Sequence, residues 1–451
     1  MARARILCQV NKLSVKTSAR GLALTALMRV FKQQSYSNIS LNHVLADQQL
    51  TPADRNLATQ IFYGTIQRKL FLEYQLKGLV RTKLREPYLE PLLLMSIYQL
   101  VFLDKIPDRA VLDEANKLAK AFGRPKSSGF RLVNGILRAF IRRQTQLPKE
   151  DLAKLSVQES FPQWLVSYFI KNWGLKRTEQ MLASLNQPAK NSTRISGLAK
   201  FDSVWQSLVQ SGFSPARSAL NPQAAILAKG GISNTPMFKE GQLTIQDEAA
   251  GLVVEAFDFA GDEQVLDACS APGGKTVQIA EHLTKGKVTA LDIHAKKLAL
   301  VEQNAKRMGV ADKVAVKACD ARQAGTFFSD QSFAKILVDA PCSGLGLLRR
   351  KPEIRYTKQL ADLRNLQRIQ LQILDQVSFL LKPTGELVYS TCSISVEENE
   401  EVIDQFLKTH ADFELVPFTA GNLTSDSGML KILPDTYGSD GFFIAKLRLR
   451  G

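Results

Sequence analysis

The stretch Val265-Leu-Asp-Ala-Cys-Ser-Ala-Pro-Gly-Gly-Lys-Thr276 decides the fold, because its pattern is that of a strand, a glycine turn and a helix start. Glycines let the backbone approach a ligand closely, and the N-terminus of the following helix offers free N–H groups. The stretch matches neither the P-loop pattern Gly-x-x-x-x-Gly-Lys-Ser/Thr nor the dinucleotide pattern Gly-x-Gly-x-x-Gly. It therefore predicts a ligand-binding loop that is neither a nucleoside triphosphate loop nor a typical dinucleotide loop.

Strands and helices alternate regularly around this stretch, from residue 241 to the end of the chain. Strands are expected at 264–268, 287–291, 313–318, 334–338, 385–390 and 441–449, and helices at 275–284, 295–308, 359–381 and 397–409. This alternation predicts a doubly wound, Rossmann-like parallel sheet. The last strand is a candidate for antiparallel addition to it.

Aspartates close three of these expected strands. Asp292 lies 19 residues after Gly273, close to the spacing of the acidic residue that binds ribose hydroxyls in nucleotide folds. Asp320 and Asp339 close the next two strands. A single strand-end aspartate is often only a helix N-cap. Three in series behind a Gly-Gly loop instead favour a shared ligand crevice, because ligands bind at the carboxyl ends of parallel strands.

Two cysteines also follow apolar, β-rich runs, Cys342 after Val338-Asp-Ala-Pro and Cys392 after Val388-Tyr-Ser-Thr. Buried cysteines are mostly inert small hydrophobes, and we keep that interpretation for Cys269 and Cys319. Two strand-end thiols downstream of a ligand loop instead favour covalent chemistry beside a bound cofactor. The five cysteines form no Cys-x-x-Cys pair and the four histidines are scattered, which favours a reducing, cytoplasmic setting without a metal site.

Charge is distributed unevenly along the 451 residues, whose net charge is +16. Residues 1–148 hold 24 Lys and Arg against 9 Asp and Glu, whereas residues 149–451 are almost balanced. Such a basic block indicates an electrostatic grip on nucleic acid, with a merely solubilising surface as the alternative. Met1 to Arg20 is expected to be a basic arm rather than a transit peptide, and no apolar run approaches the length of a membrane span.

Three domains are expected. Residues 1–148 form an all-α bundle, with helical patterns at 54–69, 70–80, 87–103, 109–122 and 127–143. Residues 149–240 hold a polar connector up to Pro162 and then a small α+β module. Helices of this module are expected at 163–173, 177–186 and 201–211, and strands near 193–195 and 224–229. Residues 241–451 form the Rossmann-like domain.

Three motifs resemble those of the RNA cytosine-5 methyltransferases: Cys269-Ser-Ala-Pro-Gly-Gly-Lys275, Asp339-Ala-Pro-Cys342-Ser-Gly and Ser390-Thr-Cys392-Ser. Asp54-Arg-Asn-Leu57 and the run from Ser127 to Arg138 resemble the helical NusB fold. The combination is similar to the bacterial 16S rRNA cytosine-5 methyltransferases of the RsmB (Sun/Fmu) type, whose target is cytosine 967. Departures from that pattern occur at Arg194-Ile-Ser196 and at Ala250.

The resemblance implies S-adenosylmethionine as the cofactor and assigns the site residues. The cofactor would be bound by Cys269, Ser270, Ala271, Pro272, Gly273, Gly274, Lys275, Asp292, Asp320 and Asp339. Cys392 would be the nucleophile, Cys342 would assist proton removal and product release, and Asp339 would hydrogen-bond cytosine N3.

The substrate would be RNA with an unpaired or flipped-out cytosine, since stacking buries C5 and C6. Expected RNA contacts are Arg194, Arg349, Arg350, Lys351 and Arg355, with a solvated loop as the alternative for residues 349–355. We expect a monomer without a metal. Alternatives are a methyltransferase acting on tRNA or another rRNA cytosine, and a non-catalytic RNA-binding assembly factor. A small-molecule methyltransferase would not need the basic block.

Overall fold

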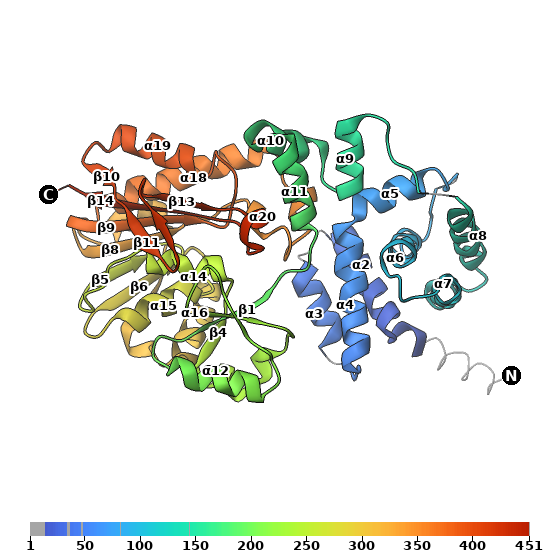
Figure 1. Cartoon of the computed structure of the whole chain (residues 1–451), viewed down its shortest axis with the longest axis horizontal. Coiled ribbons are helices and arrows are strands. Elements are labelled where there is room, and N and C mark those ends of the chain that lie inside the picture. The colour runs from blue at the N-terminus through green and yellow to red at the C-terminus, as the bar shows by residue number, and fades with distance from the viewer. Residues whose placement is uncertain (1–13, 34–36, 47, 82, 144, 451) are drawn as a thin grey trace. The chain divides into compact units, whose positions relative to one another are not determined.

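The computed structural model describes residues 14–33, 37–46, 48–81, 83–143 and 145–450 (Figure 1). The chain divides into two compact units, Met1–Asn186 with Lys351–Thr357, and Gln187–Arg350 with Lys358–Gly451. The expected boundary at 148 lies inside the first unit, and the one at 240 lies inside the second. Most of the expected basic arm lies outside the described residues.

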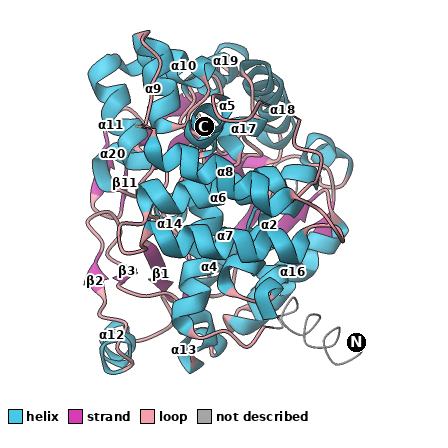
Figure 2. Cartoon of the chain, turned by 90° about the vertical axis from the view of Figure 1, so that its right-hand side faces the viewer, coloured by secondary structure: helices cyan, strands magenta, loops and turns pink. Residues whose placement is uncertain are grey.

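Helices and loops make up the described part of the first unit, which contains no strand (Figure 2). Its helices are α2 (Ala19–Gln33), α3 (Ser37–Leu45), α4 (Pro52–Gln67), α5 (Lys69–Lys77), α6 (Leu89–Phe102), α7 (Asp108–Phe122), α8 (Gly129–Arg142), α9 (Asp151–Glu159), α10 (Gln163–Trp173), α11 (Leu175–Leu185) and α17 (Ile354–Thr357). The five helices expected between residues 54 and 143 are confirmed. None of the helices that the structure describes is both long and apolar enough to cross a membrane.

Local sequence signals explain how this bundle forms. Thr51 caps α4 by accepting a hydrogen bond from the Asp54 N–H at 3.1 Å, and Pro52 occupies the first helical turn. Helix α6 is apolar on every side, and its Leu92–Met95 segment is fully buried. A helix that is hydrophobic all round belongs in a core, so α6 forms the centre of this one.

The segment 144–162 is more than a polar connector, which corrects the expectation for it. It contains α9, which Ser160 ends in the left-handed conformation with φ of 58°. The Ser160 hydroxyl accepts a hydrogen bond from the Phe71 N–H at 3.0 Å, and Phe161 is fully buried. These contacts lie within the first compact unit, as do α10 and α11, the helices expected at 163–173 and 177–186.

The second unit begins with a small antiparallel sheet of order β2-β3-β1-β4. Its strands are β1 (Asn191–Ile195), β2 (Ala216–Arg217), β3 (Ala224–Leu227) and β4 (Leu243–Ile245), accompanied by α12 (Phe201–Gln210) and α13 (Pro236–Lys239). Val204 and Leu208 of α12 share an apolar cluster with Ile195. The expected strands and the helix at 201–211 are confirmed.

The large sheet has the order β10-β14-β9-β8-β5-β6-β7, with β13 beside β14. Its strands are β5 (Gln264–Asp267), β6 (Lys287–Asp292), β7 (Val314–Ala318), β8 (Phe333–Asp339), β9 (Leu381–Thr391), β10 (Phe413–Leu415), β13 (Met429–Ile432) and β14 (Phe442–Leu449). Strands β5 to β9 are parallel, and β14 pairs antiparallel with β9, β10 and β13. All six expected strands are confirmed, whereas β10 and β13 were not expected.

Helices cover both faces of this sheet (Figure 1). Helices α14 (Glu248–Glu255), α15 (Gly274–His282) and α16 (Ala295–Arg307) lie on one face, and α18 (Leu360–Ser378) and α19 (Glu400–Thr409) on the other. Successive strand residues point to opposite faces. Leu337 accordingly packs with the α14–α15 cluster and Val338 with the α18–α19 cluster.

Candidate active site

The loops after three neighbouring strands meet at one edge of the large sheet. Strand β5 lies between β8 and β6, and the chain order reverses at this point. Ligands of open α/β sheets bind at such a reversal, beside the carboxyl ends of the strands. The glycine loop follows β5, the Cys342 loop follows β8 and the Cys392 loop follows β9, so the sheet brings all three motifs together.

The glycine loop is tightly folded before α15. Both the N–H and the hydroxyl of Ser270 donate to the Leu291 carbonyl at 2.8 Å. Gly273 has φ of +99°, and a Cβ there would lie 2.9 Å from Cα of Val301, so only glycine fits. A Cβ at Gly274 would instead meet nothing within 4 Å, which leaves open space beside a helix N-terminus.

Carboxylates next to this loop fit the cationic cofactor that the resemblance implies. Asp267 is buried and accepts a hydrogen bond from the Thr276 hydroxyl at 2.7 Å, while its Oδ1 atom has no partner within the described part of the chain. Asp292 accepts from the His294 N–H at 2.7 Å. Asp320 is the N-cap of a short helix and is held by Arg322, as the helix-cap alternative predicted. The orphaned Asp267 oxygen and the open space at Gly274 fit a ligand with donor groups.

The ionisation of Asp267 predicts a pH effect on stability. Burial raises the pKa of Asp267 to about 7, so the folded protein binds this proton more tightly than the unfolded chain. The resulting stabilisation is complete below pH about 4 and is lost as pH rises to about 7. Asp267→Asn should therefore flatten the decline in unfolding free energy between pH about 4 and 8, a change of at most about 4 kcal/mol. Urea unfolding of the wild type and of Asp267→Asn at a series of pH values measures this change. Asp312→Asn, which alters an exposed carboxylate, is the control, and its unfolding free energy should follow that of the wild type at every pH. If Asp267→Asn also follows the wild type, the raised pKa of Asp267 is contradicted.

Lys275 and Asp339 form an ion pair in the crevice, a contact that sequence reasoning missed. Nζ of Lys275 lies 2.8 Å from Oδ2 of Asp339, and the Ser390 hydroxyl donates to Oδ1 at 2.8 Å. Burial alone would lower the pKa of Lys275, but the Asp339 carboxylate outweighs it and the pKa is raised. Lys275 therefore stays charged and orients Asp339 at the end of β8.

Cys342 and Cys392 lie side by side. Their Sγ atoms are 3.2 Å apart, which is hydrogen-bonding distance for two thiols. The Gly346 N–H donates to the Cys392 carbonyl at 2.9 Å and so ties one loop to the other. The hydrogen bond to Cys392, together with burial, raises the pKa of Cys342 well above its usual value. Cys342 therefore keeps its proton next to the second sulfur.

The other two described cysteines have the character of unreactive thiols. Burial raises the pKa of Cys269 and also that of Cys319. The Cys319 thiol donates to the Asp320 carbonyl at 3.2 Å. Both sulfurs therefore remain protonated at neutral pH, as the interpretation of inert small residues requires.

Arg194 is buried, which corrects the expectation that it contacts RNA. Its guanidinium lies 2.5 Å from a carboxylate oxygen of Glu281 and donates to the Gln246 side-chain oxygen at 2.7 Å. A phosphate would have to break this buried ion pair, which is costly. Arg194 therefore joins β1 to α15 instead of facing a ligand.

The guanidinium groups of Arg349 and Arg350 also bind protein groups within the second unit. Arg349 donates to the carbonyls of Pro434 and Ser439, at 2.8 and 3.0 Å. Arg350 bridges Asp247 and Asp440, at 2.9 and 2.7 Å. The structure thus gives these arginines a packing role. For Lys351, which is half-buried, the RNA contact stays a prediction.

Arg355 is fully buried within the first unit, which is a further correction to the expected RNA contacts. Its guanidinium lies 3.8 Å from the centre of the Phe161 ring. It donates to the Gln67 carbonyl at 3.2 Å and to the Asn186 side-chain oxygen at 3.0 Å. Burial lowers the pKa of Arg355 to about 10, so the side chain remains charged at neutral pH.

Arg355→Met should destabilise the protein by about 3 kcal/mol, because buried acceptors on Gln67 and Asn186 would lose their donor. Urea unfolding of the full chain measures the loss. Arg364→Met removes an exposed arginine and should change the free energy by less than about 0.5 kcal/mol. Equal losses of unfolding free energy in the two variants would show that the buried contacts of Arg355 do not stabilise the fold.

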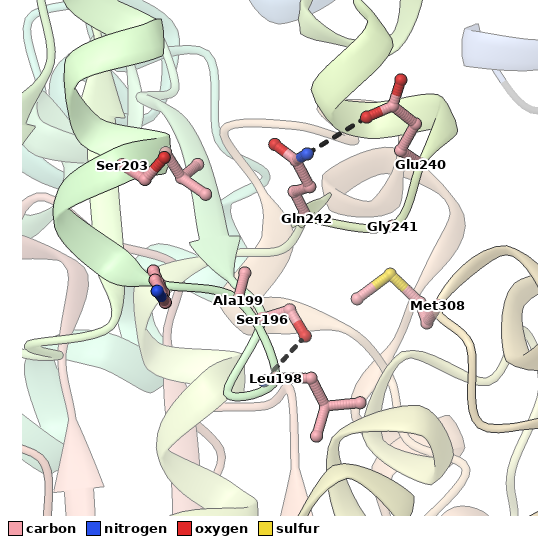
Figure 3. A pocket seen from close by; sticks show the side chains of 10 residues that line it. Ser196, Leu198, Ala199, Ser203, Glu240, Gly241, Gln242 and Met308 are labelled. Atoms are coloured by element: carbon pink, nitrogen blue, oxygen red, sulfur yellow. Dashed lines mark hydrogen bonds between the residues drawn. The ribbon is translucent and has the colours of Figure 1, made fainter.

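A separate hollow of about 380 Å³ opens in the second unit (Figure 3). Ser196, Leu198, Ser203 and Met308 contribute to its wall. The Gln242 amide there donates to Glu240 at 3.1 Å. None of the expected site residues lines this hollow, so it is distinct from the crevice at the strand ends.

Three family models match successive parts of the chain. A model described as 16S rRNA methyltransferase RsmB/F matches residues 254–448, and one of the NusB family matches residues 17–142. A model of the RsmF/B-like ferredoxin-like domain matches residues 161–232. These matches confirm the expected fold: a NusB-like bundle, a small α+β module and a Rossmann-like methyltransferase domain.

Relatives match the chain over nearly its whole length. A "Probable ribosomal RNA small subunit methyltransferase B" of Bacillus subtilis is 39% identical, with 97% of this chain and 100% of that protein covered. A "Ribosomal RNA small subunit methyltransferase B" of Erwinia tasmaniensis is 33% identical, with 96% and 98% covered. A solved structure titled "Crystal Structure of PH0851" is 26% identical, with a TM-score of 0.83 and 94% and 98% covered. The chain therefore belongs to the S-adenosylmethionine-dependent ribosomal RNA small subunit methyltransferases of the RsmB/F family.

Proposed function

We propose that this rRNA methyltransferase transfers a methyl group to C5 of a cytosine in 16S rRNA through a covalent adduct with Cys392. The observation that carries the proposal is the pair of thiols, 3.2 Å apart, at neighbouring strand ends. The Lys275–Asp339 ion pair at the end of β8 supports it. Methyl transfer to a ring nitrogen or a ribose oxygen needs no thiol, so the paired cysteines favour a carbon atom as the acceptor.

Cytosine C5 is a poor nucleophile until a thiolate adds to C6. In the proposed first step the Cys392 Sγ–C6 bond forms, and the electron pair of the C5–C6 double bond moves toward C5. C5 then attacks the methyl carbon of S-adenosylmethionine, whose methyl–sulfur bond breaks to leave S-adenosylhomocysteine. Loss of the C5 proton restores the double bond and expels the thiolate. Covalent catalysis of this kind divides one difficult step into easier ones.

Asp339 and Lys275 would offset charge as the adduct forms. Asp339 would take up a proton as the cytosine binds and donate it in a hydrogen bond to N3, so that this proton offsets the negative charge that develops at N3 as the thiolate adds. Its oxygens are already oriented by Lys275 and Ser390, so little reorganisation is needed during the reaction. Preorganised polar groups are most effective under this condition.

Cys342 would change its state during the cycle. In the free enzyme its raised pKa is caused chiefly by the hydrogen bond to Cys392. Once Cys392 is a thioether in the adduct, that cause is removed and Cys342 loses its proton to water more readily. The resulting thiolate would take the C5 proton and so promote release of the methylated base.

The proposed target is the cytosine at position 967, unpaired or flipped out of the stack so that C5 and C6 are accessible. Bisulfite sequencing of rRNA and tRNA from cells lacking the protein tests this. Loss of one 5-methylcytosine in 16S rRNA is the expected result. A loss only in tRNA or at another rRNA site would favour that alternative substrate, and unchanged maps would contradict cytosine-C5 methylation.

A further inference from the structure

Glu398 is fully buried beside the thiol pair, among hydrogen-bond donors. The N–H and hydroxyl of Ser343 both donate to its carboxylate at 2.6 Å. The hydroxyls of Ser393 and Ser395 donate at 2.6 and 2.7 Å. Among the described residues no lysine, arginine or histidine forms an ion pair with it, so neutral donors alone satisfy this buried group.

These donors come from both cysteine loops. Ser343 directly follows Cys342, and Ser393 directly follows Cys392. The two serine hydroxyls are 3.1 Å from each other. One carboxylate therefore binds the residue after each reactive thiol.

The backbone around Glu398 is itself fixed to strand β9. The Tyr389 hydroxyl donates to the Glu398 carbonyl at 2.6 Å, and the Thr391 hydroxyl donates to the Asn399 side chain at 2.6 Å. Asn399 in turn donates to the Ser393 carbonyl at 3.1 Å. The Glu398 carboxylate is thus carried by backbone that is hydrogen-bonded to β9, next to both cysteine loops.

We propose that Glu398 is a positioning residue that sets the placement of the Cys342 and Cys392 thiols relative to each other. The inference rests on the proposed function and deepens it. Glu398 acts through Ser343, Ser393 and Ser395 rather than on the substrate. Glutamine is nearly the same size, but its single carbonyl oxygen accepts fewer hydrogen bonds and its NH₂ group needs acceptors of its own.

Glu398→Gln should lower kcat by about 100-fold, because misplacing a reacting group by about 1 Å has that effect. The RNA KM and the Kd of S-adenosylhomocysteine should stay within about 2-fold, because Glu398 is fully buried and the proposal gives it no contact with either ligand. Asp404→Asn, which changes an exposed carboxylate on α19, the helix that begins two residues after Glu398, is the matched control and should keep full activity. A kcat for Glu398→Gln equal to that of the control would overturn the proposal.

Single-hydroxyl variants keep the proposal testable if Glu398→Gln folds poorly. Ser343→Ala removes the hydroxyl that ties the Cys342 loop to Glu398, so product release should slow and covalent RNA–protein adduct should accumulate about 10-fold over the wild type. Ser393→Ala removes the hydroxyl that ties the Cys392 loop to Glu398, so adduct formation should slow about 10-fold with no accumulation. Ser378→Ala, a buried serine that donates to the Asp375 carbonyl, controls for the loss of a buried hydroxyl.

Adduct levels on a denaturing gel and single-turnover rates measure these effects. Opposite behaviour of Ser343→Ala and Ser393→Ala supports the proposal. Identical behaviour, or rates equal to those of Ser378→Ala, overturns it while leaving cytosine-C5 methylation intact. If the wild-type enzyme makes no 5-methylcytosine in the same assay, the proposed function itself fails, and the two failures are thereby distinguished.

Discussion

Replacing Cys392 by alanine will abolish methyl transfer to RNA, with kcat reduced by about 10⁴- to 10⁶-fold, the range for removal of a catalytic nucleophile or its partner. Without this thiol nothing adds to C6, and C5 remains too weak a nucleophile to take the methyl group. Transfer of a labelled methyl group from S-adenosylmethionine to a 16S rRNA transcript measures the loss. Binding of S-adenosylhomocysteine should be unchanged.

The companion variant Cys342→Ala should have the opposite signature. The adduct should still form through Cys392, but its release should slow, so that a band of covalent RNA–protein complex accumulates on a denaturing gel. Cys319→Ala, which removes a buried cysteine outside the pair, should turn over normally. If Cys342→Ala also turns over normally while Cys392→Ala traps the adduct, the two roles are reversed.

Asp339→Asn should lower kcat by about 10³-fold, a magnitude typical for loss of a preorganised charge-stabilising group. The substitution removes the group expected at cytosine N3 and leaves the buried Lys275 ammonium without its carboxylate. The pKa of Lys275 should then fall, because burial would no longer be opposed by that charge. Single-turnover methylation across a range of pH measures both effects.

Ser390→Ala is the matched control for Asp339→Asn, since it removes one hydrogen bond to Asp339 and keeps the ion pair. It should cost no more than about 10-fold, because one neutral hydrogen bond contributes about 1 kcal/mol. An Asp339→Asn variant no slower than Ser390→Ala would show that Asp339 does not offset charge in the reaction.

Much of the fold was predictable because local signals agree with the tertiary structure. Leu266 and Leu337 lie in β-rich runs whose neighbours alternate between two helix layers, and each run ends near a polar residue. Such runs, separated by helical patterns, indicate an α/β fold with a parallel sheet. Thr51 and Pro52 marked the start of α4 in the same way.

The partners of buried charges were not predictable from local pattern. Lys275 and Asp339 are 64 residues apart, and Arg355 bonds to groups up to 288 residues before it. The basic residues after Cys342 have the composition of a solvated or RNA-binding loop. Nothing in the neighbouring sequence indicates that Arg355 packs against the Phe161 ring and donates a hydrogen bond to Asn186. Exposure depends on the tertiary fold, which residue type alone does not determine.

One sequence signal for the site was present but carried no predicted role. A serine follows each cysteine of the pair, and Glu398 lies six residues after Cys392. The repeat of Cys-Ser at two strand ends suggests a common acceptor only when the strands are known to be neighbours. The adjacency of β8 and β9 supplies that information.

The central claim is tested most directly by mass spectrometry of the complex formed by Cys342→Ala with a 16S rRNA transcript and S-adenosylmethionine. After digestion with nuclease and protease, the account predicts a peptide containing Cys392 whose sulfur is bonded to C6 of a cytosine that carries a methyl group on C5. A complex joined through another residue, or a transferred methyl group on any atom other than C5, would contradict it.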